Sequence, residues 1–221
     1  MRLVLPRLYV ILDAALLTIP EAECARELAD AGVRLIQYRD KSASARKLLE
    51  KSKQLSEVLA PHRITFILND RADVAALAGA SGVHVGQDDL GVEEARSVAG
   101  VGRLVGVSTH NRKQFEQAAA TSADYIAVGP IFSTSTKLNP DPVVGTELIG
   151  EVRPLTDKPI VAIGGITLER AEEVIQAGAD SVAVISDILR AQDPAARAHQ
   201  YVELLEMANH AGGPARRSAN E

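Results

Sequence analysis

The segment Ala177-Gly178-Ala179-Asp180-Ser181-Val182-Ala183-Val184 joins the end of a helix-like pattern to an apolar, strand-like run. Segments 31–36, 79–85 and 122–128 have the same form. In each of them a small residue ends the helical pattern, the chain turns tightly, and a run rich in Val, Ile, Leu or Ala begins. Small residues suit this position because helix ends often need the left-handed backbone conformation. The recurrence indicates a chain built from repeated helix–strand units.

Outward from this segment, strand-like and helix-like patterns alternate along the whole chain. Strands are predicted over 7–13, 33–39, 64–68, 82–85, 103–107, 125–128, 159–163 and 181–185. Helices are predicted over 20–31, 42–59, 71–77, 92–99, 113–120, 145–152, 167–177 and 194–208. Eight strands, each followed by a helix, predict the α/β class and a (β/α)8 TIM barrel. A doubly wound open sheet is the alternative, because periodicity does not reveal whether the sheet closes.

No linker-like stretch interrupts the alternation, so one catalytic domain is expected over 1–208. Residues 209–221 include Gly, Pro, Ser and Asn and are predicted to form a disordered tail. With 46% hydrophobic but only 3% aromatic residues, the core must consist mainly of aliphatic side chains.

Charge and cysteine content narrow the functional classes. The net charge of −5 argues against nucleic acid or an anionic membrane as partner, yet allows a local cationic pocket. The single cysteine, Cys24, excludes an internal disulfide framework and is expected to be buried and inert. No apolar run has membrane-spanning length, and the first residues lack the layout of a signal peptide. A cytoplasmic location is therefore predicted. A homo-oligomer is compatible with the sequence, which does not define the oligomeric state.

Polar residues follow the predicted strands at the end where TIM barrels bind ligands. Strand alternation puts Gln37, Arg39 and Lys41 on one side of the second strand. The other strand ends carry Asn69-Asp70, Gln87-Asp88-Asp89, Ser108-Thr109-His110, Gly164-Gly165 and Ser186-Asp187.

The longest of these connections begins Gly129-Pro130-Ile131-Phe132-Ser133-Thr134-Ser135-Thr136-Lys137. Its hydroxyls and backbone N–H groups can donate hydrogen bonds to an anion, and Lys137 adds a positive charge. A solvated loop without a ligand is the plain alternative. The loop over 129–144 is also the candidate for closure over the site. Gly164-Gly165, directly before a helix, is a second phosphate signal, because glycine lets a phosphate approach backbone N–H groups. The alternative there is an ordinary turn that needs glycine for its conformation.

Asp70 and Asp89 would repel a polyanionic ligand and each other unless a divalent cation lay between them. One or two carboxylates together with substrate phosphates is the usual way in which proteins hold Mg²⁺. Taken singly, Asp70 could cap the following helix and Asp89 could belong to a turn. Two anionic subsites, one with a metal and cations and one with hydroxyls and backbone N–H groups, favour two phosphorylated substrates.

The histidines do not complete a nucleophilic centre. His84 alternates with Val83 and Val85 and is expected to be packed inside the barrel, whereas the role of His110 is left open. Without a Ser-His-Asp or Cys-His set, covalent catalysis is not expected.

These residues, taken together and in order, resemble the thiamine-phosphate synthase (thiamine-phosphate pyrophosphorylase) family along nearly the whole chain. The resemblance rests on Gln37-Tyr38-Arg39-Asp40-Lys41, Asn69-Asp70, Val83-His84-Val85-Gly86-Gln87-Asp88-Asp89-Leu90, Gly106-Val107-Ser108-Thr109-His110, Gly129-Pro130-Ile131-Phe132 with Thr134-Ser135-Thr136-Lys137, and Ala162-Ile163-Gly164-Gly165-Ile166.

The resemblance implies a transferase that joins 4-amino-2-methyl-5-hydroxymethylpyrimidine diphosphate to thiazole phosphate, giving thiamine phosphate and pyrophosphate with Mg²⁺. The reaction it implies is dissociative: pyrophosphate leaves first, and the thiazole nitrogen then attacks a pyrimidine methylene cation. The pyrimidine-diphosphate site would comprise Gln37, Arg39, Lys41, Asn69, Ser108 and Lys137, with Tyr38 and Asp40 also counted as substrate-binding. Of these, Arg39, Lys41, Ser108 and Lys137 would be catalytic. The metal ligands would be Asp70 and Asp89. The thiazole-phosphate site would comprise Thr134, Ser135, Thr136, Gly165, Ile185 and Ser186.

Ser133 departs from the family, which usually has proline there. The related thiazole tautomerase needs no pyrophosphate site, and what weighs against it is the joint presence of Arg39, Lys41, Asn69, Asp70, Asp89 and Lys137. A thiamine-phosphate sensor would gain nothing from a metal at a leaving group. A Schiff-base aldolase would need a buried strand lysine, and the predicted strand interiors contain none.

Overall fold

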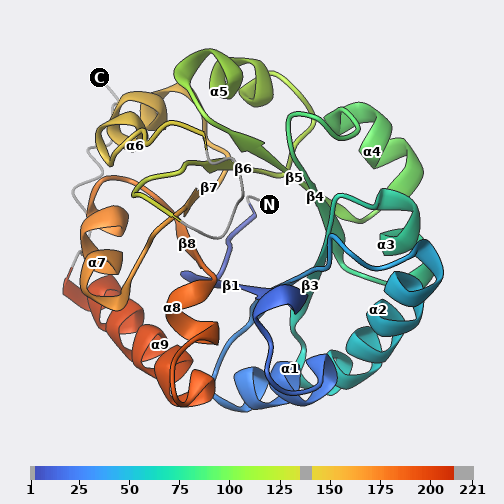
Figure 1. Ribbon diagram of the computed structural model, residues 1–221. Helices are drawn as coiled ribbons and strands as arrows, with labels where there is room; N and C mark the ends of the chain where they lie inside the picture. Colours follow the sequence, from blue (N-terminus) through green and yellow to red (C-terminus); the bar gives the residue numbers. More distant parts are fainter. Residues whose placement is uncertain (1–2, 135–140, 212–221) are drawn as a thin grey trace.

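A computed structural model describes residues 3–134 and 141–211. Parallel strands form a closed barrel in the order β1 to β8, and helices surround it (Figure 1). The strands are β1 (Leu8–Asp13), β2 (Leu35–Arg39), β3 (Thr65–Asn69), β4 (Gly82–Val85), β5 (Leu104–Thr109), β6 (Tyr125–Val128), β7 (Ile160–Ile163) and β8 (Ser181–Val184). The helices are α1 (Glu21–Asp30), α2 (Ala45–Leu59), α3 (Ala72–Ala78), α4 (Val92–Ala99), α5 (Arg112–Ala119), α6 (Glu147–Val152), α7 (Leu168–Gln176), α8 (Ser186–Leu189) and α9 (Pro194–Ala211).

The predicted TIM barrel is confirmed, and the open-sheet alternative is excluded because β1 pairs in parallel with β8. The strand predictions agree with the structure to within one or two residues. The sequence reading missed the short helix α8 directly after β8, and it ended the last helix at 208, whereas α9 runs to Ala211. The rest of the predicted tail, and Ser135, Thr136 and Lys137, lie outside the described residues.

The repeated helix–strand segment is held by an aspartate in two of its copies. The Asp180 carboxylate accepts the Ile160 N–H (2.8 Å) and pairs with Arg153, and Asp124 does the same for the Val105 N–H (2.7 Å) with Arg96. Each aspartate therefore satisfies a backbone donor at the start of the preceding strand, the first residue of β7 and the second of β5, a group that would otherwise be costly to bury. The repeat thus fixes how neighbouring strands start relative to each other.

Two apolar clusters make up the core. The larger fills the layer between the strands and the surrounding helices. The smaller lies inside the barrel and consists of Leu5, Tyr9, Ile11, Leu35, Ile67, Tyr125, Ala127, Val161 and Ala183. Cys24 is buried as expected, and burial followed by the charges of Glu27 and Glu23 raises the pKa of its thiol to about 11, so it stays protonated. No described helix combines the length and the apolar character needed to cross a bilayer.

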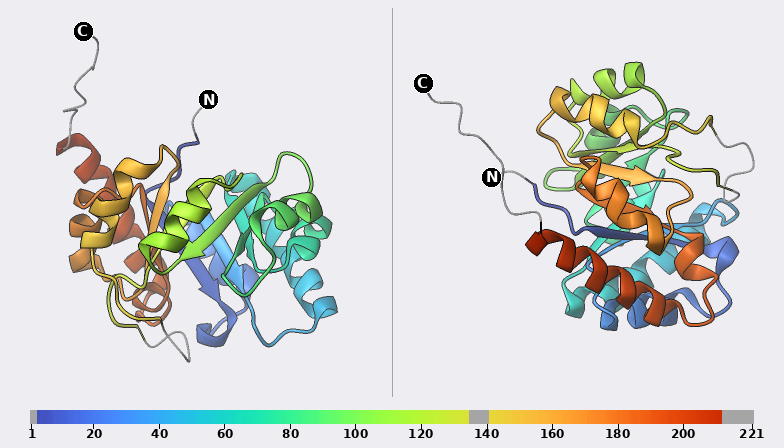
Figure 2. Two further views of the ribbon diagram at one scale, coloured as in Figure 1. Left: turned by 90° about the horizontal axis from the view of Figure 1, so that it is seen from above. Right: turned by 90° about the vertical axis from the view of Figure 1, so that its left-hand side faces the viewer.

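The two ends of the described chain lie on the same side of the barrel. Figure 2 shows the first residues entering at the amino-terminal ends of the strands and α9 finishing on that side. Residues from both ends also line one groove, including Leu5, Val202 and Leu205. The opposite end of the barrel, where the strands finish, is left for the site.

Candidate active site

A cavity of about 480 Å³ opens at the carboxyl ends of the strands. Most of the predicted site residues that the structure describes line it: Gln37, Arg39, Lys41, Asn69, Asp70, Asp89, Ser108, Thr134, Gly165, Ile185 and Ser186. Tyr38 and Asp40 do not. Because alternate residues of a strand face opposite ways, Tyr38 is buried toward α1, where its hydroxyl meets Glu21, and Asp40 binds the N–H groups of Ser42 and Ala43.

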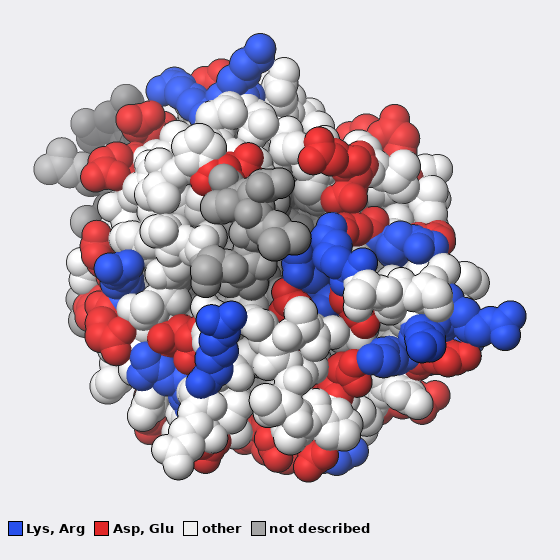
Figure 3. Space-filling view, in the orientation of Figure 1, with Lys and Arg blue, Asp and Glu red and all other residues white. Residues whose placement is uncertain are grey.

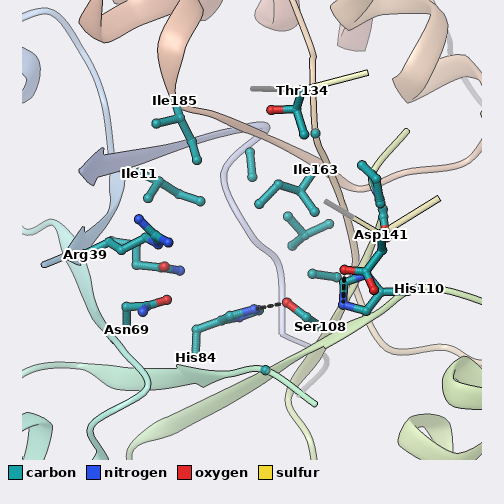
Figure 4. Close-up of a pocket in the computed structure, with 18 of the residues that line it drawn as sticks. Ile11, Arg39, Asn69, His84, Ser108, His110, Thr134, Asp141, Ile163 and Ile185 are labelled. Carbon is teal, nitrogen blue, oxygen red and sulfur yellow. Dashed lines mark hydrogen bonds and ion pairs between the residues drawn. The ribbon is translucent and has the colours of Figure 1, made fainter. Parts of the chain in front are cut away.

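The cavity has a polar side and an apolar side. In Figure 4, Arg39, Asn69, His84 and Ser108 follow one another along one edge, whereas Ile11, Ile163 and Ile185 lie together above them. The polar side comes from β2 to β5, and the isoleucines come from β1, β7 and the end of β8. Such a cavity can hold a charged group and a ring system at the same time.

Arg39 is held by a partner that the sequence reading missed. Its guanidinium pairs with Asp13 at 2.5 Å, and the Asp13 side chain is only 3% exposed. Asp13 ends β1 and lies beside Arg39 in the strand register. Asp13, like Asp70, is a carboxylate at the carboxyl end of a predicted strand. The sequence signal that identified Asp70 could therefore have identified Asp13 as well.

Asp70 has a backbone conformation that few side chains adopt. Its φ is +61°, and its N–H donates to the His84 carbonyl (2.7 Å). It does not cap α3, whose N-cap is Arg71 without a side-chain hydrogen bond. The helix-cap alternative is therefore excluded, and the carboxylate faces the cavity, where it pairs with Lys41.

Asp70 and Asp89 lie close enough to interact. Burial raises the pKa of Asp70, Lys41 opposes that rise, and the neighbouring Asp89 carboxyl adds to it. Asp89 also accepts the Gly86 N–H (2.8 Å), so this carboxylate also belongs to a turn, which was the alternative considered for it. Among the described residues, no group of three or more His, Cys, Asp or Glu side chains is arranged to hold a metal. Two adjacent carboxylates in a cavity with cations fit Mg²⁺ that takes its remaining ligands from substrate phosphates and water.

The turn after β7, which the sequence predicted as a second anionic subsite, is shaped by two glycines. Gly165 has φ +63°, and a Cβ there would lie 2.3 Å from the Ser133 carbonyl oxygen. Gly164 has φ +103°, and its Cβ would lie 2.6 Å from Pro130. The backbone after Gly129 therefore lies directly on this turn, and the Phe132 N–H donates to the Gly164 carbonyl (2.9 Å). The glycines are needed both for conformation and for close approach.

His110, left open by the sequence, connects the two ends of the loop after β6. Its Nδ1 lies 2.6 Å from the Gly129 carbonyl and donates to it, and its Nε2 lies 3.5 Å from the Asp141 carboxylate (Figure 4). These contacts tie Gly129 to Asp141.

His84 faces the cavity floor from inside the barrel. Its ring nitrogens contact the Tyr125 hydroxyl (3.1 Å) and the Ser108 hydroxyl (2.9 Å). Burial lowers the pKa of His84 to about 4, so the imidazole is neutral. Burial also raises the pKa of Tyr9 and of Tyr125, so both phenols keep their protons.

On the face seen in Figure 3, basic and acidic side chains are intermingled around the mouth, in keeping with the small net charge. A closed (β/α)8 barrel with converging polar side chains at the carboxyl ends of its strands defines the protein as a TIM-barrel enzyme.

Comparisons with known proteins then give the family. The thiamine monophosphate synthase family model matches residues 8–188. The chain is 51% identical to the thiamine-phosphate synthase of Koribacter versatilis over 91% of this chain and 96% of that protein. It is 43% identical to the thiamine-phosphate synthase of Shouchella clausii over 85% of this chain and 90% of that protein. A solved structure of thiamine phosphate pyrophosphorylase from Pyrococcus furiosus superimposes with a TM-score of 0.84 at 32% identity, covering 92% and 96% of the two chains. The chain belongs to the thiamine monophosphate synthase family.

Proposed function

We propose that the chain joins 4-amino-2-methyl-5-hydroxymethylpyrimidine diphosphate to thiazole phosphate, forming thiamine phosphate and pyrophosphate in thiamine biosynthesis. The observation that carries the proposal is one cavity, in a member of this family, that is lined both by Arg39, Lys41, Asp70 and Asp89, proposed as one anionic subsite, and by Gly165 and Ser186, proposed as the other. The tautomerase and sensor alternatives have no use for the first of these subsites. The activity is assigned to one domain over 1–208 and to the cytoplasm.

The bonds that break and form in this reaction determine what the protein must do. The C–O bond between the pyrimidine methylene and the diphosphate breaks, and its electron pair leaves with pyrophosphate. The thiazole nitrogen then gives its lone pair to the methylene cation and forms the new C–N bond. No proton has to be removed from either reacting atom. The enzyme must therefore stabilise charge on the leaving group and align the nucleophile.

Arg39 and Lys41 supply positive charge beside the diphosphate, and Asp13 keeps the Arg39 guanidinium in place. Lys137 is proposed to act with them. Asp70 and Asp89 would hold Mg²⁺, which when bound neutralises charge on the diphosphate. Ile11, Ile163 and Ile185 give an apolar wall against which the rings can pack. The residues proposed to bind the thiazole phosphate are Thr134, Ser135, Thr136, Gly165, Ile185 and Ser186.

Formation of thiamine phosphate from the two phosphorylated precursors, with Mg²⁺ and with excess EDTA, tests the function. Product is expected only with Mg²⁺, and adding Mg²⁺ back after EDTA should restore it. If no product forms while both precursors bind, the tautomerase or the sensor becomes the better assignment. Equal rates with and without EDTA would remove the metal from the proposal.

Replacing Gly165 with alanine tests the thiazole-phosphate subsite. The added Cβ collides with the Ser133 carbonyl and must push the loop or the turn away from the phosphate. Losing hydrogen bonds to a charged group costs about 1.5–3 kcal/mol, so KM for thiazole phosphate should rise about 10-fold to 100-fold. Steady-state kinetics with each substrate varied should show little change in KM for the pyrimidine diphosphate.

Gly79→Ala is the matched control. Gly79 also has a left-handed backbone (φ +70°), but nothing lies within 4 Å of the added Cβ. This variant should lose about 1 kcal/mol of stability and keep both KM values. An unchanged KM for thiazole phosphate in Gly165→Ala would show that the phosphate binds elsewhere.

A further inference from the structure

Five side chains form a continuous hydrogen-bonded line across the floor of the cavity. The Gln37 amide nitrogen lies 2.8 Å from the Tyr9 hydroxyl, and the Tyr9 hydroxyl lies 3.0 Å from that of Tyr125. The Tyr125 hydroxyl lies 3.1 Å from His84 Nδ1, and His84 Nε2 lies 2.9 Å from the Ser108 hydroxyl. The line thus begins and ends on residues of the proposed pyrimidine-diphosphate site, while its three middle members have no role in the proposed reaction.

The number of available protons allows the hydrogen bonds along the line to point in one of two directions. Each phenol has one O–H to donate, and an imidazole buried between two hydroxyls, as His84 is, is held in its neutral form with one N–H. When every hydroxyl hydrogen is used within the line, a member that donates toward Ser108 makes all the following members donate the same way, and the same holds for the reverse direction. Gln37 decides between the two, because its NH2 group faces Tyr9 and can only donate.

The resulting direction runs from Gln37 to Ser108. Tyr9 accepts from Gln37 and donates to Tyr125, Tyr125 donates to His84 Nδ1, and His84 Nε2–H donates to the Ser108 oxygen. The hydroxyl proton of Ser108 is then left for a ligand in the cavity. The Gln37 carboxamide oxygen is left as an acceptor, because its nitrogen is the atom turned toward Tyr9.

Packing holds the middle of the line in place. The Tyr125 ring stacks on His84 (centroids 5.5 Å apart, 26° between planes) and meets Tyr9 edge-on (6.1 Å, 77°). Gly106 on β5 makes room for the Tyr125 ring, since a Cβ there would lie 2.0 Å from it. Both tyrosines are fully or almost fully buried. The hydroxyls therefore have little freedom to find other partners.

We propose that Tyr9, Tyr125 and His84 are positioning residues that fix the donor and acceptor pattern presented to the pyrimidine substrate. Ser108 is held as a donor to an acceptor atom of that substrate, a ring nitrogen or a phosphate oxygen. Gln37 is held as an acceptor for an exocyclic amino group. The inference rests on the proposed function for the identity of the substrate, but the direction of the line does not depend on it.

Nitrogen-15 NMR of the histidine rings in the wild-type protein tests the direction alone. The expected result is a neutral His84 with a protonated Nε2 and an unprotonated Nδ1. The opposite tautomer would overturn the proposal, and this measurement requires neither a variant nor any enzymatic activity. In Tyr125→Phe, which keeps the ring but removes the donor to Nδ1, His84 should lose this single fixed tautomer.

Kinetics test whether the line acts on the substrate. Tyr125→Phe should lower kcat/KM for the pyrimidine diphosphate about tenfold, the value of one hydrogen bond to a polar group, and leave KM for thiazole phosphate unchanged. In a Ser108→Ala background the same change should have less than about a twofold effect, because the group on which it acts is gone. Independent, additive losses would overturn the proposal.

Tyr201→Phe is the matched control. Tyr201 is equally buried, and its hydroxyl bonds to Asp187 at 2.7 Å, away from this line. It should leave the His84 tautomer and kcat/KM for the pyrimidine diphosphate unchanged. If wild-type protein makes no thiamine phosphate but has the expected tautomer, the proposed function fails and the direction of the line stands.

Discussion

Replacing Asp70 with asparagine should lower kcat by at least about 100-fold. Removing one group that stabilises charge in a transition state typically has an effect of this size. Asparagine keeps the size of the side chain and tolerates the left-handed backbone of this residue (φ +61°), so only the charge is removed. Without it, Asp89 is left as the single carboxylate for the metal. The Mg²⁺ concentration that gives half-maximal rate should therefore rise, and a Mg²⁺ titration at saturating substrates measures both effects.

Two further variants sharpen this test. Asp70→Ala should lose the same activity and in addition about 1–2 kcal/mol of stability, because alanine is strained at positive φ. His110→Asn should cost far less turnover, because His110 contacts the Gly129 carbonyl and Asp141 rather than the carboxylate pair. A turnover close to wild type in Asp70→Asn would remove Asp70 from the metal site.

Replacing Arg39 with alanine should reduce both activity and stability. Loss of its charge beside the diphosphate should lower kcat/KM for the pyrimidine substrate about 100-fold. It also leaves Asp13, whose side chain is 3% exposed, without its cation. Removing one member of a buried pair costs about 3 kcal/mol or more, so urea unfolding should give a clearly lower free energy.

A double variant separates the two losses. Asp13→Asn combined with Arg39→Met removes both charges and fills most of the volume, and such replacements of buried pairs are often neutral. Stability should recover in the double variant, whereas kcat/KM should stay low. Recovery of kcat/KM together with stability would mean that Arg39 acts only by holding the fold together.

The second strand shows how far strand alternation alone leads. It predicted that Gln37, Arg39 and Lys41 share a face, and all three line the cavity. Tyr38 and Asp40 were added because they lie within the same matching run, yet the Tyr38 hydroxyl lies at α1 and Asp40 binds the turn that precedes α2. At this strand the physical periodicity was a better guide to the cavity than membership of a motif.

Contacts across the barrel interior could not be predicted in this way. Tyr9 and Tyr125 lie 116 positions apart in the chain, and their hydroxyls meet only because β1 and β6 face each other inside the closed barrel. Nothing in a local pattern gives that distance, which depends on strand tilt and register around the barrel. The same holds for the direction of the His84 side chain. A packed histidine was expected, but its partners Tyr125 and Ser108 were not.

The described chain begins and ends on the same side of the barrel, and this determines where other proteins can be fused to it. An affinity tag, a fluorescent module or a second enzyme joined directly before Leu3 or directly after Ala211 would be attached on the side of the molecule away from the catalytic mouth. Both ends could therefore be used at once, for example to tether the enzyme to a surface, with every copy turned so that its mouth faces the solution.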